Sequence, residues 1–462
     1  MVLFGSSFAP KDIMRLTVEA PENVSIVLLV AKYGNWTNIK EADFGKNVKL
    51  LLDGTYSLDN LDVNDDNSDL IEVIHYVLND HQTFMLKDRK TIFKPQGPGI
   101  SNYVRYIIKV VTHYYRLYKA EKPDILYFRS TPHQIESWVC ALVFEFFGTK
   151  IVTGETAPLP WRKMVSLGFR KKRQYTQLPK EVSHINADSN EQRLNELIKK
   201  NQSDYSVAIP DYEKNHLEKN GGKYYNLYRD VLAWWKHPDF IVNKYRCYKT
   251  YCSLSVPHNP NIRHIVFMLH FQPEMTTLPE GFGFAQQLAA VVALRIVAPP
   301  EIEILVKEHP WTFTGQCNPT QRHPSFYSDI VAMKGVKLLR IDSNPFNLVE
   351  SALAMATITG TIGIQATLRG TPVIYFGRPK LPDGSGIHHY ESHDKLKGFI
   401  DECVAGIPKE QVIRATIEKL KESIDYSAPS DDKEYKFVSL REERRNAELL
   451  LLRNIIAQKI AF

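Results

Sequence analysis

Short apolar runs separated by amphipathic stretches recur along the chain and predict alternating strands and helices. In the first part, the runs Val24–Ala31, Val48–Leu52 and Pro123–Phe128 have the length of buried strands. The stretches Ser101–Lys119 and Ile135–Phe147 carry apolar residues as helices do. Because strands and helices alternate, this part predicts a parallel sheet covered by helices.

The same alternation is more regular toward the carboxyl terminus. Strands are predicted at Ile265–Leu269, Ile302–Val306, Val336–Ile341, Ala356–Thr359 and Val373–Phe376. Helices are predicted at Phe284–Val297, Ser325–Lys334, Asn344–Ala354 and Ile364–Arg369. The order predicts a doubly wound, Rossmann-like α/β domain, which binds ligands beyond the carboxyl ends of its strands.

The 462 residues are enough for two such domains. We expect an N-terminal lobe over residues 1–260, with an irregular insert at 168–260 whose topology the pattern does not resolve. A C-terminal lobe over 261–426 follows the turn-rich linker Ser255–Asn261. The amphipathic segment within 427–462 is expected to form a helix that packs back on the first lobe.

Composition narrows the class of protein. Hydrophobic residues make up 44% and charged residues 24% of the chain, which is typical of a folded globular protein. No apolar run approaches the roughly 18 residues that span a bilayer, and no secretory leader is visible, so we expect a cytoplasmic protein. The five cysteines are scattered without metal-site spacing and are expected to be reduced thiols.

Positive charge is concentrated in the segment Arg170–Arg173. One interpretation is a solvated basic loop, the usual fate of a charge run. The other is peripheral contact with anionic lipid headgroups, because Trp161, Met164, Leu167 and Phe169 alternate with the cations. No nucleic-acid-binding module accompanies the segment, so we expect no nucleic acid partner.

Candidate chemistry gathers where strands of the second lobe end. Lys307 and His309 follow one strand, and the turn Thr359–Gly363 follows another and starts a helix. Backbone N–H groups at such a turn bind a phosphate without a metal, although capping of the helix is the alternative explanation. Because both strands belong to one sheet, these groups are expected to converge on one anion site.

Four segments of the second lobe together resemble the bacterial capsular-polysaccharide biosynthesis family, which includes the Kdo transferases. They are Leu269–Pro279, Val306–Pro310, Thr359–Gly363 and Gly370–Gly377. A fainter similarity covers Tyr127–His133 and Thr153–Arg162 of the first lobe.

The resemblance implies a GT-B glycosyltransferase, in which two Rossmann-like lobes face a cleft. It implies transfer of a nonulosonic acid, Kdo or a sialic-acid-like sugar, from a CMP donor to a surface polysaccharide or glycolipid. Similar His-Pro elements occur in bacterial sialyltransferases, so the sugar is left open. The implied nucleotide-binding residues are Lys307, His309, Pro310, Thr359, Gly360, Thr361 and Gly363.

Transfer through an oxocarbenium-like transition state calls for two carboxylates. Glu274 and Glu155 each follow a predicted strand, in different lobes. By position in the family pattern Glu274 is the expected nucleophile of a retaining reaction, and Glu155 the acid/base. Capping or salt bridging is the alternative role for either glutamate. Further cleft candidates are His133, Gln272 and Glu308.

We expect neither a metal nor another cofactor. A CMP-sugar carries one phosphate, which a helix N-terminus, His309 and Lys307 can neutralise without a divalent ion. The acidic run Asp62–Asp69 lacks the glycine and terminal glutamate of a calcium loop.

Two other functions stay open. One is a non-catalytic capsule assembly or export factor that keeps the fold. The other is a GT-B enzyme for a UDP- or GDP-sugar, such as an epimerase, which usually grips the ribose with a carboxylate; the first acidic residue after Gly377 is Asp383. A transferase of this class would meet a glycan or lipid-linked acceptor at the inner face of the cytoplasmic membrane.

Overall fold

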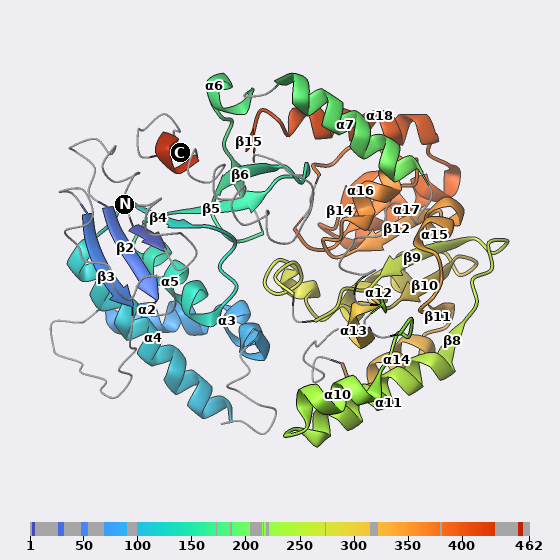
Figure 1. Cartoon of the computed structure of the whole chain (residues 1–462), viewed down its shortest axis with the longest axis horizontal. Coiled ribbons are helices and arrows are strands. Elements are labelled where there is room, and N and C mark those ends of the chain that lie inside the picture. The colour runs from blue at the N-terminus through green and yellow to red at the C-terminus, as the bar shows by residue number, and fades with distance from the viewer. Residues whose placement is uncertain are drawn as a thin grey trace. The chain divides into compact units, whose positions relative to one another are not determined.

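The computed structural model describes residues 2–4, 26–31, 48–53, 69–89, 99–171, 173–184, 187–203, 215, 217–218, 221–272, 274–314, 322–378, 381–429 and 451–455. The chain divides into two compact α/β units (Figure 1). Unit 1 comprises residues 1–187 and 421–462, and unit 2 comprises residues 188–420.

Unit 1 is built on a mixed sheet with the strand order β15-β6-β5-β4-β1-β2-β3, in which β7 also pairs with β6. The strands from β1 to β5 are parallel, whereas β6 pairs antiparallel with β5, β7 and β15. The strands are β1 (Val2–Phe4), β2 (Ile26–Ala31), β3 (Val48–Asp53), β4 (Ile125–Phe128), β5 (Lys150–Thr156), β6 (Arg162–Leu167), β7 (Gln174–Tyr175) and β15 (Ser427–Pro429).

The helices of unit 1 pack an apolar face on this sheet and on one another. They are α2 (Leu70–Leu78), α3 (His81–Met85), η2 (Leu86–Arg89), α4 (Ile100–Glu121), α5 (Ile135–Phe146) and α6 (Lys180–Ser183). The longest, α4, buries Tyr103, Ile107 and Val111 at helical spacing. It ends where Lys122 adopts a left-handed conformation (φ 39°) just before Pro123, which cannot continue the helix.

Unit 2 contains a seven-stranded, fully parallel sheet with the order β14-β13-β12-β9-β10-β11-β8. Its strands are β8 (Ser255–Val256), β9 (His264–Met268), β10 (Glu303–Lys307), β11 (Val336–Leu339), β12 (Ala354–Thr357), β13 (Val373–Tyr375) and β14 (Ile387–His389). Apart from the edge strand β8, this is the order of a dinucleotide-binding Rossmann domain. The strand order reverses between β9 and β12, where such sheets bind ligands.

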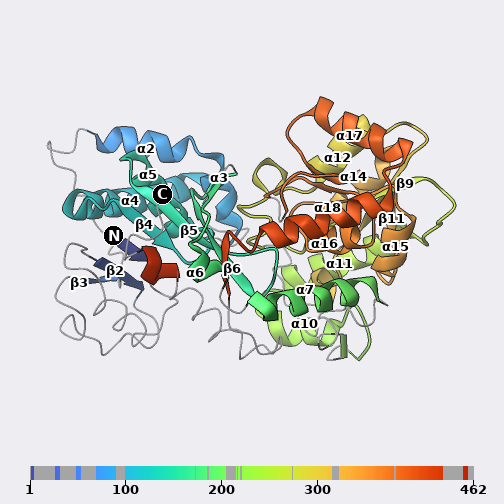
Figure 2. The ribbon, with the colours of Figure 1, turned by 90° about the horizontal axis from the view of Figure 1, so that it is seen from above.

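Helices cover both faces of the second sheet. They are α7 (Ala187–Gln202), α10 (Leu227–Trp234), α11 (Pro238–Leu254), η3 (Phe282–Phe284), α12 (Leu288–Val297), α13 (Trp311–Thr314), α14 (Pro324–Ala332), α15 (Pro345–Ser351), α16 (Ile362–Leu368), α17 (His393–Ala405) and α18 (Lys409–Glu422). One core joins β9 and β10 to α11, α12, α14 and α17, and a smaller one joins the opposite face to α15 and α16 (Figure 2). Burial on both faces explains why these strands are almost continuously apolar in sequence.

The α/β class and the alternation of elements in each half are confirmed, but the expected boundary at residue 260 differs from the division in the structure. Helix α11 buries Cys247 and Tyr251 in the core of unit 2, and Ser255 pairs with Leu338 of β11. The expected linker therefore begins with an edge strand. The insert expected in the first lobe instead supplies α7, α10 and α11 to unit 2.

The carboxyl-terminal part of the chain returns to unit 1 through β15. The buried guanidinium of Arg162 holds this strand: it donates to the hydroxyl of Ser427 (2.7 Å) and to the carbonyl oxygens of Ser183 (2.6 Å) and Ile424 (3.2 Å). Burial lowers the pKa of Arg162 to about 10, against the opposing charge of Asp425. This antiparallel strand pairing was not predicted.

Of the expected terminal helix, residues 451–455 are helical and belong to unit 1. The remainder of that helix lies outside the described residues. The acidic run 62–69 also lies outside them except for Asp69, whose carboxylate pairs with the ammonium of Lys119 at 2.6 Å.

The described residues of the basic segment differ in exposure: Lys171 is exposed, as in a solvated loop, whereas Arg170 and Arg173 are ion-paired, and peripheral membrane contact stays a prediction. Arg170 is 3.1 Å from the carboxylate of Asp80 and 2.8 Å from that of Glu145. Arg173 forms a buried ion pair with Glu155, and Phe169 is fully buried. Two cations are thus neutralised inside unit 1, and an apolar side chain expected at a membrane packs in the core. Lys172 lies outside the described residues.

Candidate active site

His270 occupies the switch point of the second sheet, just beyond the end of β9. Its backbone is clamped by the buried amide of Gln287, which accepts from the His270 N–H (2.7 Å) and donates to the His270 carbonyl (3.0 Å). The same carbonyl accepts a hydrogen bond from Arg322 (2.8 Å). Three hydrogen bonds therefore fix the backbone of His270, from which the imidazole extends.

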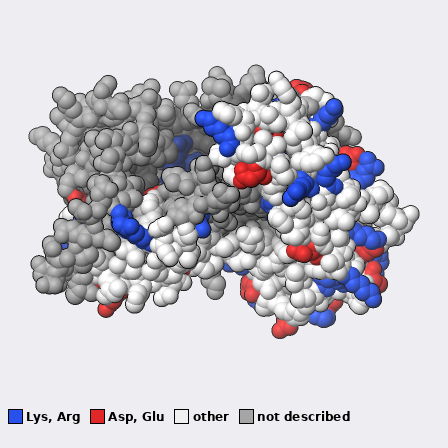
Figure 3. Space-filling model, turned by 90° about the horizontal axis from the view of Figure 1, so that it is seen from below, with Lys and Arg blue, Asp and Glu red and all other residues white. Residues whose placement is uncertain are grey.

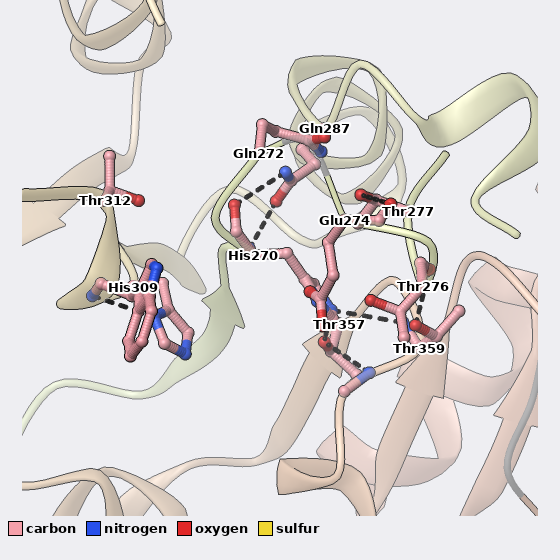
Figure 4. A network of polar contacts seen from close by, with 12 residues as sticks. His270, Gln272, Glu274, Thr276, Thr277, Gln287, His309, Thr312, Thr357 and Thr359 are labelled. Atoms are coloured by element: carbon pink, nitrogen blue, oxygen red, sulfur yellow. Dashed lines mark hydrogen bonds and ion pairs between the residues drawn. The ribbon is translucent and has the colours of Figure 1, made fainter. Parts of the chain in front are cut away.

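The imidazole of His270 connects two strand ends (Figure 4). Its Nδ1 lies 3.3 Å from Oε2 of Glu274, and its Nε2 lies 3.0 Å from Oγ1 of Thr357. The backbone N–H of Thr359 also donates to Nε2 (3.4 Å). Because a backbone N–H can only donate, Nε2 is the acceptor in the neutral ring and the proton on Nδ1 points to Glu274.

Glu274 is held in its ionised form. Burial raises the pKa of its carboxyl, but the hydrogen bond and charge of His270, with smaller effects of Thr276 and His309, bring the pKa below its ordinary value. About a third of the side chain, 30%, is exposed. The carbonyl of Glu274 accepts from the N–H groups of Thr277 (3.2 Å) and Leu278 (2.8 Å), so a tight turn presents the carboxylate. An ionised, accessible carboxylate suits a nucleophile and not a general acid.

The turn after β12 packs directly on His270. Gly360 donates its N–H to Oγ1 of Thr357 (3.3 Å), and the hydroxyl of Thr359 donates to the carbonyl of Thr276 (2.7 Å). A Cβ on Gly360 would lie 2.7 Å from Oγ1 of Thr357, so only glycine fits. Thr361 is exposed at the cap of α16, and its side chain makes no capping hydrogen bond. The turn therefore does more than cap a helix.

Gly363 lies in the first turn of α16, where the absence of a side chain leaves room for Tyr375 of β13. A Cβ at Gly363 would collide with the buried Tyr375 ring and hydroxyl. Glycine at this position thus has a packing role.

His309 lies beyond β10. Its Nδ1 accepts the backbone N–H of Trp311 (3.1 Å), so in the neutral ring the proton is on Nε2. Burial lowers the pKa of His309 to about 4; the charge of Glu274 opposes this shift, and those of His270 and Lys307 add to it. His309 is therefore an uncharged hydrogen-bond donor at neutral pH, not the cation that we expected. Pro310 follows it and begins the turn into α13, where its carbonyl accepts from Phe313 (3.1 Å).

Lys307 ends β10 and is buried, with 2% of the residue exposed. In the register of the sheet, Met268 of β9 pairs with Lys307 on one side and with Thr357 on the other. Three adjacent strands thus end in a line. The pKa of His309 responds to the charges of both Lys307 and Glu274, so both lie within electrostatic reach of His309.

Glu308 points away from this chemistry and is fully buried. Its carboxylate accepts from the N–H of His309 (2.8 Å), from Arg322 (3.0 Å) and from the hydroxyls of Thr312 (3.1 Å) and Tyr327 (2.8 Å). With four partners, Glu308 orients the loop that carries His309 and does not face a substrate. Gln272 is also buried, and its amide donates to the carbonyl of Ala285 (3.4 Å).

The two candidates in unit 1 belong to one separate network. Glu155 on β5 is buried and pairs with Arg173; it also accepts from Ser166 (2.9 Å). Arg173 donates to the hydroxyl of Thr131 (3.0 Å), and His133 Nδ1 lies 2.8 Å from the Thr131 carbonyl. Glu155 thus forms the salt bridge that was its alternative role; its part as acid/base stays a prediction.

Sequence reasoning did not select His270, Thr357, Gln287 or Arg322 as site residues. His270 follows its strand immediately and Thr357 precedes the Thr-Gly-Thr turn, so position alone could have indicated both. Gln287 and Arg322 carry no local signal, because their contacts with the His270 backbone span 17 and 52 residues.

Among the described residues, no three His, Cys, Asp or Glu side chains are grouped as ligands of a metal ion. No helix in the described part of the chain is both long and apolar enough to span a bilayer.

Residues 279–425 match the family described as capsule polysaccharide biosynthesis protein. This match confirms the family resemblance and links the chain to capsule polysaccharide synthesis. It begins at Pro279, after Glu274, and covers β10, the turn after β12, β13 and β14. A search of the curated proteins gives no match.

Several solved structures are similar to the chain. The β-Kdo 2,7-transferase KpsC of Thermosulfurimonas dismutans is 11% identical over 72% of this chain and 88% of its own, with a TM-score of 0.30. HepE of Anabaena, in complex with UDP and glucose, is 10% identical over 99% and 98%, with a TM-score of 0.25. The UDP-GlcNAc 2-epimerase of Methanocaldococcus jannaschii is 12% identical over 91% and 98%, with a TM-score of 0.25.

Proposed function

We propose that the protein is a glycosyltransferase that moves a nonulosonic acid from a CMP donor to a capsular or other surface glycan. The observation that carries this proposal is the position of Glu274. An ionised and accessible carboxylate stands at the switch point of a Rossmann sheet, hydrogen-bonded to His270 and within electrostatic reach of His309. The family match of residues 279–425 supports the substrate class.

The donor phosphate would bind at the ends of β10 and β12. Neutral His309 offers its Nε2–H, Lys307 supplies a positive charge, and Thr361 adds an exposed hydroxyl. One phosphate carries less charge than a diphosphate, and these groups suit it without a divalent ion. This is why we propose a CMP-sugar over a UDP- or GDP-sugar.

The reaction proceeds with retention in two steps. First, a carboxylate oxygen of Glu274 bonds to the anomeric carbon while the bond from that carbon to the phosphate oxygen breaks, and CMP leaves with the bonding electrons. Then an acceptor hydroxyl bonds to the anomeric carbon, and the ester bond to Glu274 breaks. The hydroxyl proton passes to a base, for which Glu155 is the candidate. A lipid-linked glycan acceptor would bring the enzyme to the inner face of the cytoplasmic membrane.

Calorimetric titration with CMP, UDP and GDP, with and without EDTA, tests the donor. We expect CMP to bind most tightly and EDTA to change nothing. His309→Gln should weaken CMP binding about ten-fold, the cost of one hydrogen bond to a charged group. If UDP binds more tightly than CMP, the donor is a UDP-sugar and the proposal of a CMP donor is wrong. Absence of any nucleotide binding would favour the assembly or export factor.

A further inference from the structure

Helix α10 of unit 2 carries an exposed apolar stripe. Tyr228, Leu232 and Trp235 are spaced four and three residues apart, so they share one side of the helix. They are 71%, 61% and 68% exposed, which is unusual for three large side chains in a row. The residues of this α10 stripe are Leu227, Tyr228, Val231, Leu232 and Trp235. Val242 and Tyr245 of α11 are also exposed.

The stripe rests on a firmly attached helix. On the opposite side of α10, Asp230 forms a buried ion pair with Lys244 of α11 at 2.7 Å. Trp234 packs edge-on against Phe240 with ring centroids 5.6 Å apart. Because α10 already uses its inner side to pack on α11, the apolar outer side has no structural role within the unit.

Basic residues outnumber acidic ones in the segment that carries the stripe. From Gly221 to Leu254 the chain carries six basic and two acidic residues. Asp230 and Lys244 pair with each other, and four of the other basic residues, Lys223, Lys236, Arg246 and Lys249, are exposed together with the acid Asp239. Lys236 extends over the Trp235 ring, 5.1 Å from its centroid. Figure 3 views the molecule from the side on which α10 and α11 lie in Figure 1, and there Lys and Arg are scattered, together with Asp and Glu, among uncharged surface.

We propose that the α10 stripe docks the protein on an anionic lipid surface. An interfacial helix combines aliphatic and aromatic side chains on one side with cations around them, and this is the pattern here. A second copy of the chain would bring the exposed cations of this segment, Lys236 beside Trp235 among them, toward the same cations of its partner. A glycan chain would stack on Tyr228 and Trp235 but would leave Leu227, Val231 and Leu232 unsatisfied. The charges and the aliphatic residues together therefore favour lipid.

The docking helix is connected to the candidate active site through α11. Asn243 and Cys247 of α11 contact the carbonyl of Arg322 at 2.8 and 3.5 Å, and the Tyr251 hydroxyl accepts from the N–H of Glu308 (3.1 Å). These are the residues that support His270 and His309. A membrane bound at α10 would thus lie one helix away from the site, where lipid-linked substrates are available.

Co-sedimentation of the full chain with phosphatidylcholine vesicles, with and without phosphatidylglycerol, tests the proposal. We expect binding to the anionic vesicles that weakens as salt is added. The double substitution Leu232→Ser and Trp235→Ser should weaken it by about ten-fold or more, because two apolar side chains no longer enter the interface. Lys236→Gln should weaken it about five-fold.

Ile296→Ser is the matched control, because Ile296 is a 67% exposed apolar residue on α12, outside the stripe. It should leave vesicle binding unchanged. The proposal fails if the chain does not bind anionic vesicles, if it binds neutral ones equally, or if the double variant binds as well as the parent. It also fails if light scattering shows a dimer that the double variant abolishes. CMP titration of the same variants reports on the nucleotide site alone, so this test and that of the proposed function fail separately.

Discussion

His270 and Thr357 join the two halves of the second sheet: the imidazole Nε2 lies 3.0 Å from the threonine Oγ1, across a sequence separation of 87 residues. One residue follows β9 and the other ends β12, the two strands between which the strand order reverses. The hydroxyl also accepts the N–H of Gly360. The hydroxyl of Thr357 therefore connects the imidazole that contacts Glu274 to the turn that we propose binds the phosphate.

Removal of this hydroxyl should slow the reaction more than it weakens donor binding. Thr357→Val keeps the shape of the side chain but leaves His270 Nε2 and the Gly360 N–H without their shared partner. We expect a fall in kcat of about ten- to hundred-fold with a smaller change in KM, and a stability loss of about 1–3 kcal/mol. Thr357→Ser, which keeps the hydroxyl, should restore most of the rate. Equal losses in both variants would mean that the loss of the hydroxyl alone does not account for the effect.

The proposed nucleophile can be tested without loss of the fold. Glu274→Gln keeps the size of the side chain and should reduce transfer by about a thousand-fold or more, while CMP still binds. In Glu274→Ala, added azide should restore cleavage of the donor and give a sugar azide of inverted configuration. If the glutamine variant transfers sugar at an appreciable rate, Glu274 is not the nucleophile.

Local sequence pattern was sufficient for five of the seven strands of the second sheet, β9 to β13, and for the positions of Lys307, His309 and Thr359 at its edge, but not for β8 and β14. The apolar runs predict the strands, and the polar residues that follow each run predict the side chains at the edge of the sheet. The same reasoning failed where a role depends on distant contacts. No local signal predicted that Arg162 is buried, and it is buried because carbonyls some 260 residues later in the chain accept its hydrogen bonds. Helix α11 was assigned to the wrong unit because no local feature says which core will accept Tyr251.

The role of Glu308 also depends on distant contacts. Its position next to His309 in the sequence suggested a residue of the cleft. The structure gives it a structural role, so Glu308→Gln should leave the buried Arg322 without a counter-charge. We expect a stability loss of about 3–5 kcal/mol, measured by urea unfolding. Glu303→Gln removes the partner of Lys337 in a half-exposed pair and should cost less than about 1 kcal/mol. Comparable losses for the two variants would contradict the structural role of Glu308.

The depressed pKa of His309 predicts how stability depends on pH. His309 has a pKa of about 4 in the folded chain and an ordinary value of 6.5 in the unfolded chain. Between these values the unfolded chain binds the additional proton, so stability falls as the pH falls through this window and reaches a total loss of about 3 kcal/mol below it. The lowered pKa of Glu274 adds a loss in the same direction at still lower pH, because its stabilising charge disappears. Urea unfolding at pH 7.5 and pH 5 should therefore show a larger decrease for the parent than for His309→Gln, which lacks the titrating group while retaining Glu274. Identical decreases would contradict the lowered pKa of His309 in the folded chain.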